Sequence, residues 1–174
     1  MAHLRKAPWP KRQLSMEEFQ QVFVACLRDR ACWRVGKVLG SMLFFDFGAK
    51  VSVPRLKGGF VEAGQATISV NDCHWKLFVG GEMVTDSDSI TDEQGRDLLK
   101  HFEGSDLCAV TVMDADCIHL VFSNGTHLSV DTTNQYGTDD PIIDFVAPSG
   151  EIYKMSADGL LYLTDVVSST RFVH

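Results

Sequence analysis

The feature that most constrains the fold is an internal similarity between the two halves of the chain. Residues 42–53 match residues 119–130 at an offset of 77, and a capping-box sequence precedes each segment, at residues 15–18 and 91–94. A Ser or Thr followed three residues later by Glu or Gln is typical of a helix start, because each residue caps a free backbone N–H group. Each half is therefore predicted to run from a helix into a strand, a glycine turn and a second strand.

The two predicted helices differ in length. In the first, apolar residues recur at spacings of three and four positions, as on one buried helix face: Phe19, Val22, Phe23, Cys26 and Leu27. The second is shorter, with Leu98, Leu99 and Phe102 expected to face inward. Gly104 is the expected end of this helix, since glycine readily takes the left-handed conformation found there.

The hairpin signal is strongest at Asn124-Gly125. This pair favours a two-residue turn, because both central positions of that turn need a positive φ. With this tip, Val121 pairs with Leu128 and His119 with Val130, and these four side chains share one face. Gly48 predicts the equivalent turn in the first half, where the matching face carries Met42, Phe44, Val51 and Val53.

These expectations combine into an α+β fold. It consists of a tandem duplication of a helix plus antiparallel-sheet unit, with the two halves packed on a shared core. The expected divisions are a basic flexible N-terminal tail at 1–14, a first repeat at 15–88, a second repeat at 89–166 and a C-terminal tail at 167–174. The two repeats together are expected to form one compact domain.

Charge is distributed unevenly along the chain. Residues 1–81 hold 12 Lys and Arg against 6 Asp and Glu, a balance of +6, whereas residues 82–174 hold 4 against 17, a balance of −13. This asymmetry predicts that the acidic half attracts a basic partner and repels nucleic acid and anionic membrane surfaces. The alternative is a solvated acidic face that only keeps the protein soluble.

No motif assigns a catalytic function. The chain lacks the common nucleotide-binding, metalloprotease, hydrolase and CxxC patterns. Residues 86–92 begin like a calcium-binding loop, but Ile90 stands where an oxygen ligand belongs. Cys117 and His119 alternate onto one strand face, which suits half of a zinc site, yet no second pair has a recognisable spacing. We therefore expect no catalytic residue, no metal and no cofactor.

The cysteines and the hydropathy indicate the compartment. The five cysteines form an odd set without paired spacing, which predicts reduced thiols: Cys26, Cys32, Cys73, Cys108 and Cys117. Cys108 and Cys117 lie in the acidic half, which disfavours a thiolate nucleophile. No apolar run approaches the roughly 20 residues of a membrane helix. We expect a cytoplasmic protein that has no membrane partner.

Two short segments resemble parts of small bacterial domains of unknown function. They are residues 73–77 and residues 120–128, and Gly104 lies between them. Several such domains occur among the immunity proteins of polymorphic and contact-dependent toxin systems. The resemblance implies a non-catalytic module that binds a basic toxin domain, and no catalytic residue carries over. The expected partner-binding residues are acids near the second helix and the long loop: Asp86, Asp88, Asp92, Glu93, Asp139 and Asp140.

Two alternatives remain open. In the first, the protein self-associates, because the basic half of one molecule can dock on the acidic half of another. In the second, the crevice between the halves binds a small ligand or substrate, which a deep polar pocket with shifted pKa values would favour. The aromatic strand residues have too few basic residues interleaved among them to predict nucleic-acid binding, although a basic patch that could face phosphates is present at Arg28, Arg30, Arg34 and Lys37.

Overall fold

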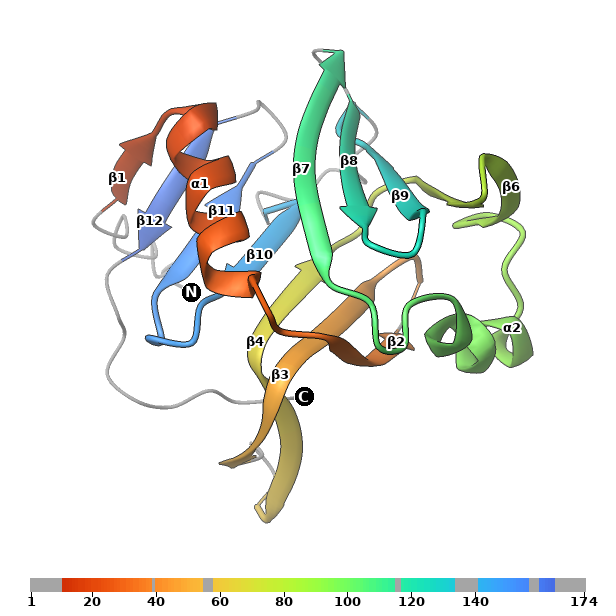
Figure 1. Cartoon of the computed structure of the whole chain (residues 1–174), viewed down its shortest axis with the longest axis horizontal. Coiled ribbons are helices and arrows are strands. Elements are labelled where there is room, and N and C mark those ends of the chain that lie inside the picture. The colour runs from red at the N-terminus through yellow and green to blue at the C-terminus, as the bar shows by residue number, and fades with distance from the viewer. Residues whose placement is uncertain are drawn as a thin grey trace, which may run out of the picture.

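Two antiparallel sheets form most of the molecule (Figure 1). The computed structural model describes residues 11–38, 40–54, 58–114, 117–133, 141–156 and 160–164. The seven-stranded sheet has, in spatial order, β1 (Lys11–Leu14), β12 (Leu161–Thr164), β11 (Ile152–Met155), β10 (Ile143–Val146), β4 (Phe60–Val70), β3 (Leu43–Pro54) and β2 (Cys32–Lys37). The five-stranded sheet has β6 (Glu82–Asp86), β5 (Trp75–Val79), β9 (Thr126–Asp131), β8 (Cys117–Phe122) and β7 (Leu107–Asp114).

The expected α+β duplication is wrong, because the fold is mostly β and the two halves share both sheets. In the seven-stranded sheet β4 of the first half pairs with β10 of the second, and β1 pairs with β12. In the five-stranded sheet β5 pairs with β9. Since strands of both halves are interleaved, the described part of the chain does not divide into two helix-plus-sheet units with a crevice between them.

The expected hairpin at Gly48 is also wrong. β3 is one continuous strand, and Gly48, with φ +72°, lies at a register shift in its pairing with β4. Glycine takes this left-handed conformation without strain, so it forms a bulge within the strand. The inward face of β3 consequently differs from the expected one, and its buried apolar residues are Leu43, Phe45, Phe47 and Val53.

The hairpin between β8 and β9 is confirmed, but its register differs by one residue. Residues 123–125 form the loop, and Leu120 pairs with Leu128. Gly125 has φ +82°, whereas Asn124 is not among the described residues with positive φ, so the two-residue turn does not form. A shift of one residue exchanges the two faces of a strand. Ile118, Leu120 and Phe122 are therefore buried, and His119 lies on the outer face.

Both capping boxes are confirmed. Ser15 Oγ accepts from Glu18 N at 3.1 Å, and the Glu18 carboxylate accepts from Ser15 N at 2.8 Å. Thr91 and Gln94 make the same pair of bonds at 3.2 and 2.9 Å. The first box starts α1 (Met16–Leu27), which buries Phe19, Phe23 and Leu27. The second starts the short α2 (Asp92–Asp97), which continues into the 3-10 helix η1 (Leu98–His101).

An aromatic core joins the helices and sheets. Phe23 of α1 lies 4.2 Å from Phe145 of β10, measured between ring centroids. Phe45 of β3 lies 5.1 Å from Phe102 and 5.9 Å from Phe122 of β8. One face of the seven-stranded sheet is therefore covered partly by α1 and partly by the five-stranded sheet, as Figure 1 shows. The outer face of the five-stranded sheet points away from this core.

The expected N-terminal tail at 1–14 is in part a strand, because Lys11–Leu14 form β1 at one edge of the seven-stranded sheet. The remainder of that tail and the expected tail at 167–174 lie outside the described residues. Within the described ranges, neither helix has the length and apolarity needed to cross a lipid bilayer.

Candidate functional site

A polar groove of about 530 Å³ lies where β5, β8 and β9 meet the turn between β6 and α2. We call it the β5–β9 groove, and it is lined by His74, Trp75, Lys76, Asp86, Ser87, Asp88, Cys117, Ser129, Asp131 and Thr133. A second cavity, of about 550 Å³, is lined by Val35, Gly36, Lys37, Gly95 and Arg96, which include no carboxylate, thiol or imidazole. A smaller cavity, of about 140 Å³, includes Asp97, Lys100 and His101 in its lining. The β5–β9 groove is the larger of these two carboxylate-lined cavities.

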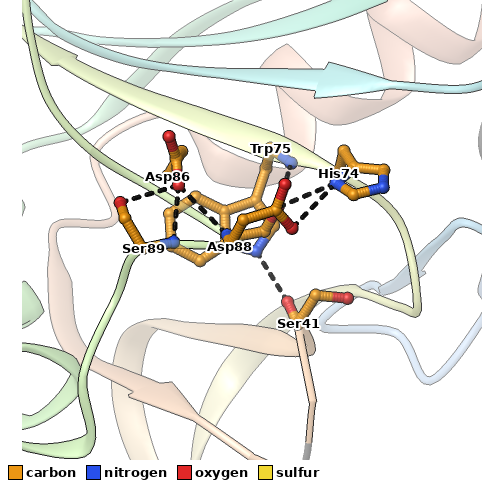
Figure 2. A network of polar contacts seen from close by, with 7 residues as sticks. Ser41, His74, Trp75, Asp86, Asp88 and Ser89 are labelled. Carbon is orange, nitrogen blue, oxygen red and sulfur yellow. Dashed lines mark hydrogen bonds and ion pairs between the residues drawn. The ribbon is translucent and has the colours of Figure 1, made fainter.

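The start of β5 holds both walls of the groove in place. Ser87 N donates to Trp75 O at 2.9 Å, which fixes the β6–α2 turn. Asp131 N donates to His74 O at 2.8 Å, which fixes the end of β9. The Trp75 side chain is 1% exposed, and its Nε1 donates to Ser41 O at 2.6 Å (Figure 2). The two walls are thus positioned by backbone bonds to a strand that is anchored in the core.

Asp86 organises the β6–α2 turn. Its Oδ1 accepts bonds from Asp88 N at 3.0 Å, Ser89 N at 2.7 Å and Ser89 Oγ at 2.7 Å (Figure 2). These bonds, with the Ser89 hydroxyl as the largest cause, lower the pKa of Asp86. The carboxylate is therefore ionised at neutral pH.

Asp131 is held in the same way on the opposite wall. Its Oδ1 accepts from Thr133 Oγ1 at 2.6 Å and from Thr133 N at 2.8 Å. The Thr133 hydroxyl is the largest cause of a lowered pKa at Asp131, and Lys76 lowers the pKa of both Asp131 and Asp86. Lys76 consequently interacts electrostatically with both carboxylates.

His74, Ser87 and Asp88 do not form a catalytic relay. His74 Nδ1 lies 3.1 Å from Asp88 Oδ1 and 3.3 Å from Ser87 Oγ, so both groups meet the same ring nitrogen. A Ser-His-Asp triad needs its hydroxyl and its carboxylate at opposite ring nitrogens. Ser87 Oγ also accepts from Trp75 N at 3.3 Å, which ties it to β5. The contacts among these three side chains therefore hold the β6–α2 turn against the start of β5.

The outer face of β8 and β9 carries a thiol and an imidazole close together. Cys117 Sγ lies 3.5 Å from His119 Nε2 and 3.0 Å from Ser129 Oγ. The His119 ring stacks on His127 at 5.5 Å, and His127 stacks on Phe78 at 4.5 Å, between centroids. Among the described side chains, no three His, Cys, Asp or Glu residues are placed to hold a metal ion.

The structure brings together only some of the predicted binding residues. Asp86 and Asp88 line the groove, whereas Glu93 is exposed on α2. Asp92 starts α2 but its side chain is not among those described, and Asp139 and Asp140 lie outside the described residues. Sequence reasoning missed Asp131. The signal for it was local, since an Asp two residues before a Thr at a strand end is typical of an Asx turn.

The groove therefore presents ionised carboxylates on two walls, one lysine between them and, at its β8 end, the Cys117 thiol, which lies beside the His119 imidazole. Its chemistry suits the binding of a positively charged group more than a serine-type acyl transfer. Comparison of the chain with protein-family models, with curated proteins and with solved structures found no match.

Proposed function

We propose that the protein is a non-catalytic binding module that holds a basic segment of a partner protein in the β5–β9 groove. The observation that carries the proposal is the way Asp86 and Asp131 are held on opposite walls of one groove. Their hydrogen-bond donors are hydroxyl and backbone N–H groups, which position each carboxylate without cancelling its charge. Asp88 adds a third carboxylate beside Asp86.

The positions of the bonded oxygens support the same function. All the bonds described above for Asp86 and Asp131 reach Oδ1. A carboxylate has two oxygens and about four acceptor sites, so each group keeps the capacity to accept further bonds from a guanidinium or ammonium group. Such charge-assisted bonds are stronger than neutral ones, and arginine can make two in parallel.

The proposed partner is a basic toxin domain, as the resemblance to immunity proteins implies, and the proposed compartment is the cytoplasm. A net charge of −7 agrees with this choice, because an acidic surface speeds the encounter with a basic protein. The acidic groove would then pair with lysine or arginine side chains of the toxin. The salt dependence of binding follows directly, since exposed charges are screened by added salt.

The test uses a fluorescent hexa-arginine peptide as the probe and measures its affinity for the full chain by anisotropy. The double variant Asp86→Asn/Asp131→Asn removes two charges but keeps an acceptor oxygen at each Oδ1 position. We expect the affinity to fall about threefold to tenfold, the sum of two exposed ion pairs. Binding should also weaken as salt rises.

The matched control removes the same amount of charge elsewhere. Glu17 lies exposed on α1, and Glu62 lies exposed on β4. Glu17→Gln/Glu62→Gln should leave the affinity nearly unchanged. Equal losses in the two double variants would mean that the peptide responds only to net charge, and no loss in the groove variant would remove the groove as the binding site.

A further inference from the structure

Cys117 combines access to the groove with a neighbouring base. The residue is partly exposed and lines the β5–β9 groove. Its sulfur lies 3.5 Å from His119 Nε2, within hydrogen-bond reach for a thiol. A thiol is activated as a nucleophile when an adjacent base can take its proton. The Ser129 hydroxyl, at 3.0 Å, is placed to donate to the sulfur once the proton has left.

The other cysteines lack this combination. Cys32 and Cys73 are fully buried, and burial raises the pKa of each thiol to about 12. Burial also raises the pKa of Cys26, with the charge of Glu151 as a further cause. Cys108 is exposed, but its thiol donates to the carbonyl oxygen of Asp106 at 3.8 Å, and a backbone carbonyl is not a base.

We propose that Cys117 is a modification site that reacts with small disulfides entering the β5–β9 groove. His119 Nε2 takes the thiol proton, and Cys117 Sγ attacks one sulfur of the disulfide. A bond forms between these two sulfurs while the S–S bond of the reagent breaks. The departing thiolate takes the proton from the His119 imidazolium, so that Cys117 is oxidised to a mixed disulfide and the released half of the reagent is reduced to a thiol.

The charges around the thiol select the reagent. Asp131 lies directly opposite Cys117 in the register of β8 and β9, and its carboxylate is ionised at neutral pH. Residues opposite each other in antiparallel strands have Cβ atoms about 5 Å apart. A cationic disulfide is therefore attracted to the site and an anionic one is repelled. The same carboxylate disfavours a free Cys117 thiolate, as the sequence predicts, so the reaction depends on proton transfer to His119. This inference concerns the chemistry of the thiol and does not depend on the proposed protein partner.

The experiment treats the reduced full chain with cystamine, a cationic disulfide, and follows each cysteine by quenched peptide mass mapping. Cys117 should form its mixed disulfide about tenfold faster than Cys108, although Cys108 is the more exposed residue. His119→Gln should slow the reaction at Cys117 about tenfold, because the proton acceptor is lost. The rate at Cys108 should not change.

The matched control is His127→Gln, which replaces the histidine stacked on His119 and should leave the Cys117 rate nearly unchanged. Cys32 and Cys73 report on folding, because they become reactive only when the core opens. If the His119→Gln variant is unfolded by this criterion, the proposal is still tested by the ratio of the reaction rates of Cys117 and Cys108 in the unaltered chain. A Cys117 rate no higher than that of Cys108, or an unchanged rate in a folded His119→Gln variant, would overturn the proposal.

Discussion

Asp46 on the seven-stranded sheet is held in a different way from Asp86 and Asp131 on the five-stranded sheet. On the seven-stranded sheet, Asp46 of β3 is 1% exposed and forms an ion pair with Arg34 at 2.5 Å. It also accepts from Gly64 N at 2.8 Å and Thr67 Oγ1 at 2.7 Å. On the five-stranded sheet, Asp86 and Asp131 are bonded by neutral donors at the walls of an open groove.

The comparison distinguishes a carboxylate whose charge is neutralised within the fold from carboxylates that can still bind another molecule. The Asp46 charge is matched by a cation and enclosed, so it stabilises the fold only as part of a complete set of partners. The charges of Asp86 and Asp131 are positioned but remain uncancelled by those bonds, so they can act on another molecule. Removal of the two kinds of carboxylate should therefore affect mainly different properties, namely stability in the first case and binding in the second.

The largest expected effect is the loss of stability in Asp46→Ala. The substitution leaves the buried Gly64 N and the partly buried Thr67 hydroxyl and Arg34 guanidinium without this acceptor. Breaking a fully buried ion pair from one side costs about 3–5 kcal/mol. Because water can reach part of Arg34, we expect a loss of about 2–4 kcal/mol here. Urea unfolding monitored by fluorescence measures it. A loss below about 1 kcal/mol would contradict the structural role of Asp46.

The next-largest effect should come from Gly64→Ala, which tests how closely β3 and β4 pack beside Asp46. A Cβ atom at Gly64 would lie 2.6 Å from both Ala66 O and Phe47 N, and 2.8 Å from Asp46 Cβ. The contacting atoms are mostly backbone, which cannot rotate away, so we expect a loss of about 1–3 kcal/mol. The free energy of unfolding should fall by this amount in urea titrations. An unchanged value would show that β3 and β4 separate easily here.

The stability cost of Asp131→Asn should be largest at neutral pH and should shrink in acid. The pKa of Asp131 is lower in the folded protein than its ordinary value near ~3.9, so the ionised group favours folding. This contribution is present above the unfolded pKa and is lost as the pH falls through the folded pKa. The stability difference between the unaltered chain and the variant should therefore shrink below about pH 4. A difference that stays constant down to pH 2 would contradict this.

The smallest effect is expected for Glu62→Gln on β4. Glu62 pairs with Lys50 at 3.4 Å, but the two side chains are 65% and 55% exposed. Exposed ion pairs contribute only about 0.2–1 kcal/mol, because water and salt screen them. At both low and high salt, the free energy of unfolding of the variant should lie within about 1 kcal/mol of that of the unaltered chain. A larger loss would mean that exposed carboxylates on this sheet also support the fold.

Local signals in the sequence predicted local structure well. The capping boxes located the starts of both helices, because their hydrogen bonds join residues only three positions apart. Asp86 and Asp88 were named as acids near the second helix, whereas the turn that Asp86 organises was not predicted.

Long-range pairing could not be predicted in the same way. In the loop between β8 and β9, Asn124 Nδ2 donates to His101 O at 2.7 Å, and this partner is distant in the sequence. Gly48 forms a bulge because β4 lies beside β3 on both sides of it. The similarity of the two halves indicated a duplication, but the order of strands in a sheet depends on contacts that periodicity does not contain. For the same reason, the sequence did not predict that Asp131 and Asp86 line the same groove.

The most direct test of the central claim maps where a basic ligand binds. Amide and side-chain NMR shifts of the full chain are recorded while hexa-arginine is added at low salt. The account predicts shifts concentrated at residues 74–76, 86–89 and 129–133, with little change around Asp46. Shifts spread evenly over the exposed acids, or centred on the seven-stranded sheet, would contradict the assignment of the β5–β9 groove as the binding site.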